Sequence, residues 1–91
     1  MKETIEQLLT QSLQHMRESG AIPSDVVVEV KVDRSKDKTH GDFATNLALL
    51  LAKPCGQAPR KLAAQIVEFL PENSLVERLE IAGAGFINFF Y

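Results

Sequence analysis

Two short stretches of the 91-residue sequence combine residue types that could do chemistry. The first is HGDFATN, in which His40 and Asp42 lie two residues apart and could form an acid–base pair. No nucleophile accompanies them, because Cys55 and the serines stand in unrelated sequence contexts. A helix N-cap at Asp42 and a loop position for His40 account for both residues. We therefore predict no catalytic residue, and the absence of zinc-ligand spacing predicts no metal site.

The second stretch is GAGFINFFY, which sets one amide, Asn88, among large apolar side chains. Side chains alternate along a strand, so Phe86, Asn88 and Phe90 share one face, while Ile87 and Phe89 face the helices. Aromatic rings stack on nucleic-acid bases, and an amide offers the donor and the acceptor that read a base edge. Looped or single-stranded RNA is the predicted partner, and ordinary core packing of the phenylalanines is the alternative.

Apolar periodicity predicts the elements that precede this strand. Capping-box spacing of Thr4 and Gln7 indicates an amphipathic first helix that Gly20 ends. The alternating stretch DVVVEVKV predicts a strand with one buried face. Asp42 is the predicted N-cap of a second helix that runs from Phe43 to about Lys53 and ends at a proline.

A third helix and a hairpin are predicted for the C-terminal part. Pro59 suits the first turn of the helix, and Pro71 stops it. SLVERLEIAG is the next strand, and Gly83 and Gly85 give a tight turn into the last one. The predicted fold class is α+β in a single domain over residues 1–91, with the order α-β-α-α-β-β. A small antiparallel β-sheet of about three to four strands packs against three helices.

Composition and charge limit the class of protein. The sequence is 45% hydrophobic and 24% charged, as in ordinary globular domains, and no apolar run is long enough for a membrane span. A single cysteine fits a cytoplasmic location. A net charge of −2 argues against a nucleic-acid binder as a whole, and neither DNA nor a membrane is an expected partner. Basic residues nevertheless gather in KVDRSKDKTH, which is either a solvated loop or a contact for RNA phosphates. These residues are Lys31, Arg34, Lys36 and Lys38.

Three stretches together resemble the N-terminal additional domain of bacterial-type arginyl-tRNA synthetases. They are HGDFATNLALLLAK, APRKLAAQIVEFL and ERLEIAGAGFINFF, in that order, and the resemblance covers essentially the whole chain. It implies a domain without catalytic residues or a cofactor of its own. The parent enzyme would be a class I synthetase that uses ATP, with magnesium, to join arginine to its tRNA in a catalytic domain absent from this sequence.

The resemblance also implies a partner and a contact. In that family the domain docks the tRNA elbow and contacts a D-loop nucleotide through an aromatic residue and an amide two positions later. Phe86 and Asn88 match these two places, and Gly83 and Gly85 match the turn before them. Phe90 and the four basic residues would add to the tRNA-binding surface. The implied partners are tRNA and the enzyme's own catalytic domain.

Two other classes of function remain open. GAGFINF is similar to a strand of the RNA-recognition-motif family, although Ala82 and Ala84 stand where that family has a basic and an aromatic residue. A protein-interaction module would instead present the same aromatic face to another protein. Binding that weakens steeply with salt would indicate RNA rather than an apolar protein interface.

Overall fold

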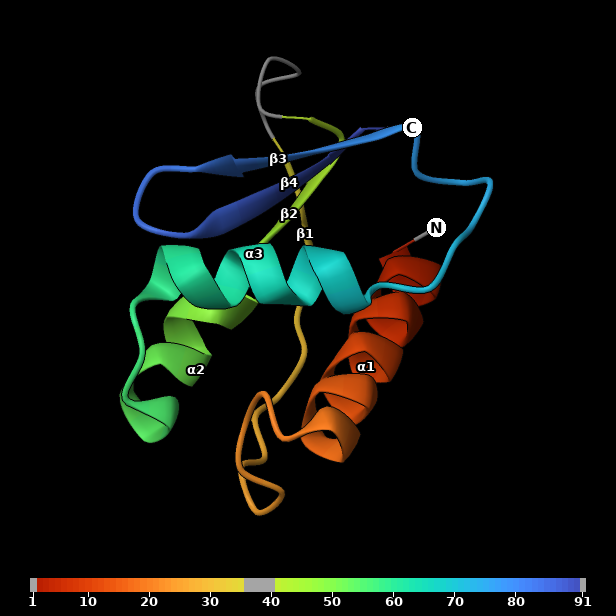
Figure 1. The fold of residues 1–91 in the computed structure, drawn as a ribbon. Coiled ribbons are helices and arrows are strands. Elements are labelled where there is room, and N and C mark those ends of the chain that lie inside the picture. The colour runs from red at the N-terminus through yellow and green to blue at the C-terminus, as the bar shows by residue number, and fades with distance from the viewer. Residues whose placement is uncertain (1, 36–40, 91) are drawn as a thin grey trace.

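The computed structural model describes residues 2–35 and 41–90, and places three helices on one side of a four-stranded antiparallel sheet (Figure 1). The helices are α1 (Lys2–Ser19), α2 (Leu47–Cys55) and α3 (Pro59–Phe69). The strands are β1 (Asp33–Arg34), β2 (Phe43–Thr45), β3 (Arg78–Ala82) and β4 (Phe86–Phe90). The order across the sheet is β1-β2-β4-β3, so β4 lies between β2 and β3. The predicted α+β fold is confirmed, with one strand more than the predicted order contains.

The apolar stripe of α1 packs into the core as its spacing predicts. Ile5, Leu9, Leu13 and Met16 are all at most 1% exposed. The predicted capping box is wrong, because α1 begins at Lys2 and Thr4 therefore lies inside its first turn rather than at the N-cap. α3 lies beside α1, and the buried hydroxyl of Ser12 donates a hydrogen bond of 2.7 Å to the Ile66 carbonyl. The core thus forms between the three helices and the sheet.

Residues 42–46 depart most from the sequence prediction. Asp42 does not cap a helix: Phe43–Thr45 forms β2, and α2 begins only after Asn46. β2 pairs with β1 on one side and β4 on the other, and the Asp42 N–H donates to the Phe89 carbonyl at 2.7 Å. Pairing with β1 and β4 provides hydrogen-bond partners for the N–H and C=O groups of β2 in a strand conformation. This pairing outweighs the apolar spacing that predicts a helix from Phe43.

Two further boundaries differ from the prediction. Pro54 lies inside the last turn of α2, which continues to Cys55 and is capped by Gly56 in the left-handed conformation. β3 begins later than predicted, at Arg78. The residues before it form a turn in which Asn73 Oδ1 accepts hydrogen bonds from the Leu75 and Val76 N–H groups.

The segment DVVVEVKV does not form a strand, so this prediction is wrong in part. Its alternation in burial is as predicted, since Val26 and Val32 are buried while Val27 is 82% exposed. Strand pairing begins only after this segment, at Asp33–Arg34, which pairs with β2. The observed element order, α-β-β-α-α-β-β, also differs from the βαββαβ order of an RNA-recognition motif.

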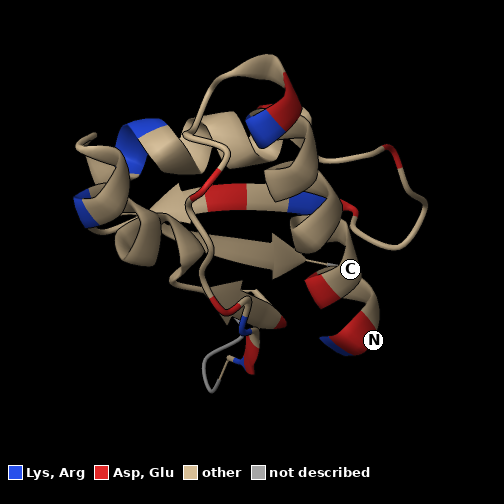
Figure 2. Ribbon diagram, turned by 90° about the horizontal axis from the view of Figure 1, so that it is seen from below, with Lys and Arg blue, Asp and Glu red and all other residues tan. Residues whose placement is uncertain are grey.

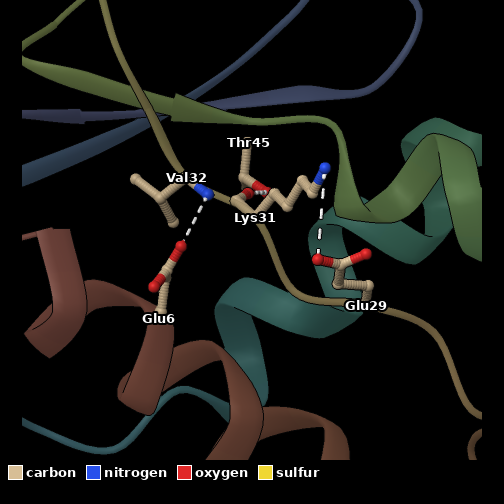
Figure 3. A network of polar contacts seen from close by, with 5 residues as sticks. All are labelled: Glu6, Glu29, Lys31, Val32 and Thr45. Carbon is tan, nitrogen blue, oxygen red and sulfur yellow. Dashed lines mark hydrogen bonds and ion pairs between the residues drawn. The ribbon is translucent and has the colours of Figure 1, made fainter.

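Side chains take the place of a neighbouring strand along this segment (Figure 3). The Val32 N–H donates to Glu6 Oε2 of α1 at 3.2 Å, and the Lys31 carbonyl accepts from Thr45 Oγ1 at 2.7 Å. The Thr45 hydroxyl also accepts from the Leu47 N–H at 3.2 Å, at the start of α2. One buried hydroxyl therefore links this segment, β2 and α2.

Replacing Thr45 with valine is expected to reduce the free energy of unfolding by about 1–3 kcal/mol. Valine keeps the shape of the side chain but leaves the Lys31 carbonyl and the Leu47 N–H without their partner. Urea denaturation of the chain measures the change. Thr45→Ser is the matched control, because it keeps the hydroxyl and loses only one methyl group. A valine variant as stable as the serine variant would contradict this role of the hydroxyl.

Candidate nucleic-acid interface

The helices cover one side of the sheet and leave the other side open (Figure 1). Phe86, Asn88 and Phe90 of the central strand β4 lie on this other side, since they alternate with the core residues Ile87 and Phe89. We call this side the open face. The side chains between them, Ile87 and Phe89, are 0% exposed and pack among the helices. Phe86, in contrast, is 43% exposed. The predicted division of side chains between the two faces is therefore observed, although Asn88 is also buried.

Asn88 is more buried than its place on the open face of an alternating strand predicts. It is only 5% exposed, because strands flank it on both sides. Its direct cross-strand neighbours are Ala44 on β2 and Glu80 on β3. None of the described residues forms a hydrogen bond with its side chain, and its amide is not among their fully buried polar atoms without a partner. The amide donor and acceptor are therefore available to a ligand.

The Asn88 amide and the Phe86 ring line one open cavity of about 310 Å³. The cavity is open because small residues lie on the neighbouring strands: Ala44 lies across from Asn88, and Ala82 lies across from Phe86. The volume is near the lower limit of ligand sites, so it suits one planar ring better than a large molecule. The lining residues are Ser35, Ala44, Ala82, Gly83, Phe86 and Asn88.

The turn before Phe86 is fixed against the start of α3. Gly83 and Gly85 have positive φ angles of 58° and 141°, as their place in a tight turn predicts. A Cβ on Gly85 would lie 2.8 Å from the Pro59 Cβ, so only glycine permits this approach. Arg60 Nη1 donates to the Gly83 carbonyl at 2.6 Å. The sequence gives no sign of these contacts, because Pro59 and Arg60 are far from the turn along the chain.

Phe90 shares the open face but differs from Phe86 in its surroundings. The Arg78 guanidinium carbon lies 4.0 Å from the centroid of the Phe90 ring. Arg78 also pairs with Glu80, at 3.6 Å between nitrogen and oxygen. One face of the Phe90 ring is therefore covered by a cation, whereas Phe86 lines the cavity.

The basic residues predicted to approach phosphates do not line this cavity. Lys31 pairs with Glu29 at 4.0 Å (Figure 3). The Arg34 guanidinium lies 5.5 Å from the ring centroid of Phe43, a residue buried on the helix side of the sheet. The structure therefore does not bring Lys31 or Arg34 together with Phe86 and Asn88. Lys36 and Lys38 lie outside the described residues, as does His40.

The described ranges hold no group of three or more His, Cys, Asp or Glu side chains that could bind a metal ion. Burial raises the pKa of the Cys55 thiol, which stays protonated at neutral pH. None of the helices α1, α2 and α3 is both long and apolar enough to cross a membrane.

Comparisons with known proteins match this chain, along almost its whole length, to arginyl-tRNA synthetases. A family model described as "Arginyl tRNA synthetase N terminal domain" matches residues 3–91. Arginine–tRNA ligase of Legionella pneumophila (strain Paris) is 58% identical over 90 residues, and that of Idiomarina loihiensis is 55% identical over 89 residues. The alignments cover 99% and 98% of this chain, and 15% of each relative. The chain therefore spans about 15% of the length of these curated relatives.

Two solved structures share the fold. Arginyl-tRNA synthetase of Thermus thermophilus matches with a TM-score of 0.77 at 27% identity, over 99% of this chain and 14% of that one. Arginyl-tRNA synthetase of Plasmodium falciparum matches with a TM-score of 0.80 over 98% of this chain and 15% of that one. The second match is 17% identical and shows similarity of fold alone.

Proposed function

Because the chain belongs to the arginyl-tRNA synthetase N-terminal domain family, we propose that it is the tRNA-recognition domain of an arginine–tRNA ligase. The ligase joins arginine to its tRNA with ATP and magnesium, in a catalytic domain outside this chain. This domain does no chemistry and docks the tRNA elbow. The observation that carries the proposal is the cavity on the open face, which an exposed phenyl ring and an available amide line together.

Phe86 and Asn88 contact one D-loop nucleotide in complementary ways. The base stacks on the Phe86 ring, an interaction that contributes about 1–3 kcal/mol at other aromatic platforms. Its edge then reaches the Asn88 amide, which offers both a donor and an acceptor. The base must be turned out of the loop to enter the cavity, as is usual where proteins read RNA loops.

The fold holds the two side chains in place before the tRNA arrives. β4 is paired on both sides, and the turn before Phe86 is anchored by Pro59 and Arg60. A site on a rigid strand loses little conformational entropy when a ligand binds. Binding energy gained at the elbow then orients the distant acceptor end of the tRNA in the catalytic domain.

Crosslinking from position 86 tests this proposal in the full-length enzyme. A photoreactive phenylalanine analogue placed at Phe86 is expected to crosslink to the D-loop of the tRNA. Leu50 on α2 is a matched control position, because it is 42% exposed, as against 43% for Phe86, but does not line the cavity. Equal D-loop yields from the two positions, or crosslinks from position 86 confined to another arm, would contradict the proposal.

A further inference from the structure

One long stretch of the sequence carries only positive charge. Between Asp42 and Glu68 there is no acidic residue, although the whole chain has a net charge of −2. The same stretch contains three basic residues, Lys53, Arg60 and Lys61. It forms β2, α2 and the greater part of α3.

The fold places these three residues on either side of the short link between α2 and α3. Lys53 lies in the last turn of α2, while Arg60 and Lys61 lie in the first turn of α3. All three are exposed, and none forms an ion pair with a carboxylate of the described residues. Figure 2 shows this part of the domain with Lys and Arg segments on the helices and no acidic segment beside them. We call Lys53, Arg60 and Lys61 the cationic end.

The cationic end adjoins the cavity through the turn of β3 and β4. Arg60 Nη1 lies 2.6 Å from the carbonyl oxygen of Gly83, and Gly83 lines the cavity together with Phe86. Gly85 packs on Pro59, the residue before Arg60. A nucleotide whose base enters the cavity would therefore have a phosphate near the turn that Arg60 holds, and Lys61 follows Arg60 in the first turn of α3.

Charge on the open face directs phosphates to this end. Asn88 stands in a cross-strand row that runs from Asp33 through Ala44 and Asn88 to Glu80. Asp33 at one end of the row repels a phosphate placed over the middle of the sheet, whereas Glu80 at the other end pairs with Arg78. The cationic end has the opposite sign.

The position of Arg60 and Lys61 also conflicts with helix stability. The first turn of a helix favours acidic side chains, and cations there oppose the helix dipole. The first turn of α3 has two cations and no acid. Local rules of this kind are most often broken where function requires it.

We infer from this arrangement that the cationic end binds backbone phosphates of the tRNA, next to the nucleotide whose base enters the cavity. The inference rests on the proposed function, because it assumes that the partner is tRNA. Lys53 and Lys61 supply mobile point charges, while Arg60 also holds the Gly83 carbonyl and so connects the phosphate contact with the turn.

The salt dependence of tRNA binding tests the inference in the full-length enzyme. A Lys53→Gln, Lys61→Gln double variant should bind tRNA more weakly at low salt. Its slope of log Kd against log salt concentration should fall by about 1–2, since each lost phosphate contact lowers the slope by about 0.7–0.9. Arg60 is left unchanged because its bond to Gly83 has a structural role. Lys2→Gln is the control for the loss of a lysine charge elsewhere on the domain, since Lys2 lies at the start of α1 and does not line the cavity.

A second variant separates this inference from the proposed function. Asn88→Ala should reduce discrimination between tRNAs that differ in the D-loop base, with the salt slope unchanged. The double variant should change the slope and keep the discrimination. A slope change without any effect of Asn88→Ala would support the cationic end and contradict the D-loop contact. A double variant with the same slope as Lys2→Gln would overturn the inference, whatever Asn88→Ala does.

Discussion

Asn88→Ala is expected to lower kcat/KM for tRNA in the full-length enzyme by about 10-fold or more, since one good base contact is worth about 1–3 kcal/mol. Asn88 offers the cavity an amide donor and acceptor that no described residue uses, so alanine removes a contact for which the cavity has no substitute of the same chemistry. Steady-state aminoacylation of transcripts that differ at one D-loop position measures the effect. The loss should be largest for the preferred base and small for the others.

A change on the neighbouring strand checks this result without touching the amide. Ala44 lies directly across from Asn88, and its small side chain leaves the cavity open. Ala44→Leu should fill the cavity and reduce kcat/KM for tRNA in the same way. Circular dichroism establishes that both variants keep the fold. A folded Asn88→Ala enzyme with unchanged kinetics on every transcript would rule out the proposed contact.

Gly85→Ala is expected to reduce the free energy of unfolding by about 2–4 kcal/mol, which combines an unfavourable backbone conformation with overpacking. The φ angle of 141° is one that residues with a Cβ rarely adopt. The added Cβ would also lie 2.8 Å from the Pro59 Cβ and 3.0 Å from the Pro59 carbonyl carbon. Domains of this size are stable by about 5–15 kcal/mol, so the loss is a large fraction of the total.

Gly83→Ala is the matched control for this prediction. Gly83 lies in the same turn at a φ of 58°, but its added Cβ would meet only the Phe86 ring, at an ordinary contact distance of 3.7 Å. The expected loss is about 1–2 kcal/mol, the cost of a left-handed conformation alone. Urea denaturation compares the free energies of unfolding of the two variants, provided that both have the same m-value. Equal losses would show that the contact with Pro59 does not limit position 85.

The parts of the fold that follow from the sequence are those that depend on neighbouring residues. The stripe of α1, the proline at the start of α3 and the alternation of β4 are all local patterns, and the structure confirms them. β2 has only three residues, too few for periodicity to separate a strand from the first turn of a helix. Its conformation depends on pairing with β4, which lies far along the chain.

For the cavity too, local patterns predict some of the lining residues, whereas contacts between distant segments decide the others. Alternation places Phe86 and Asn88 on one face, but the depth of Asn88 depends on β4 being the central strand. Ala44 and Ser35 could not be predicted as lining residues, because no local pattern gives the register of β1 and β2 against β4. Charge along the sequence likewise does not show on which side of the sheet Arg34 lies.

The central place of β4 has a consequence for biosynthesis. β2 pairs with β4, and β3 pairs with β4, but β2 and β3 do not pair with each other. While the ribosome is still adding the residues before Phe86, β3 has no neighbouring strand and β2 has only the two residues of β1. Helices can form early in the nascent chain, since their contacts are local, whereas pairing between distant segments is slower. The sheet, and the cavity on it, can form only after translation has passed Phe90.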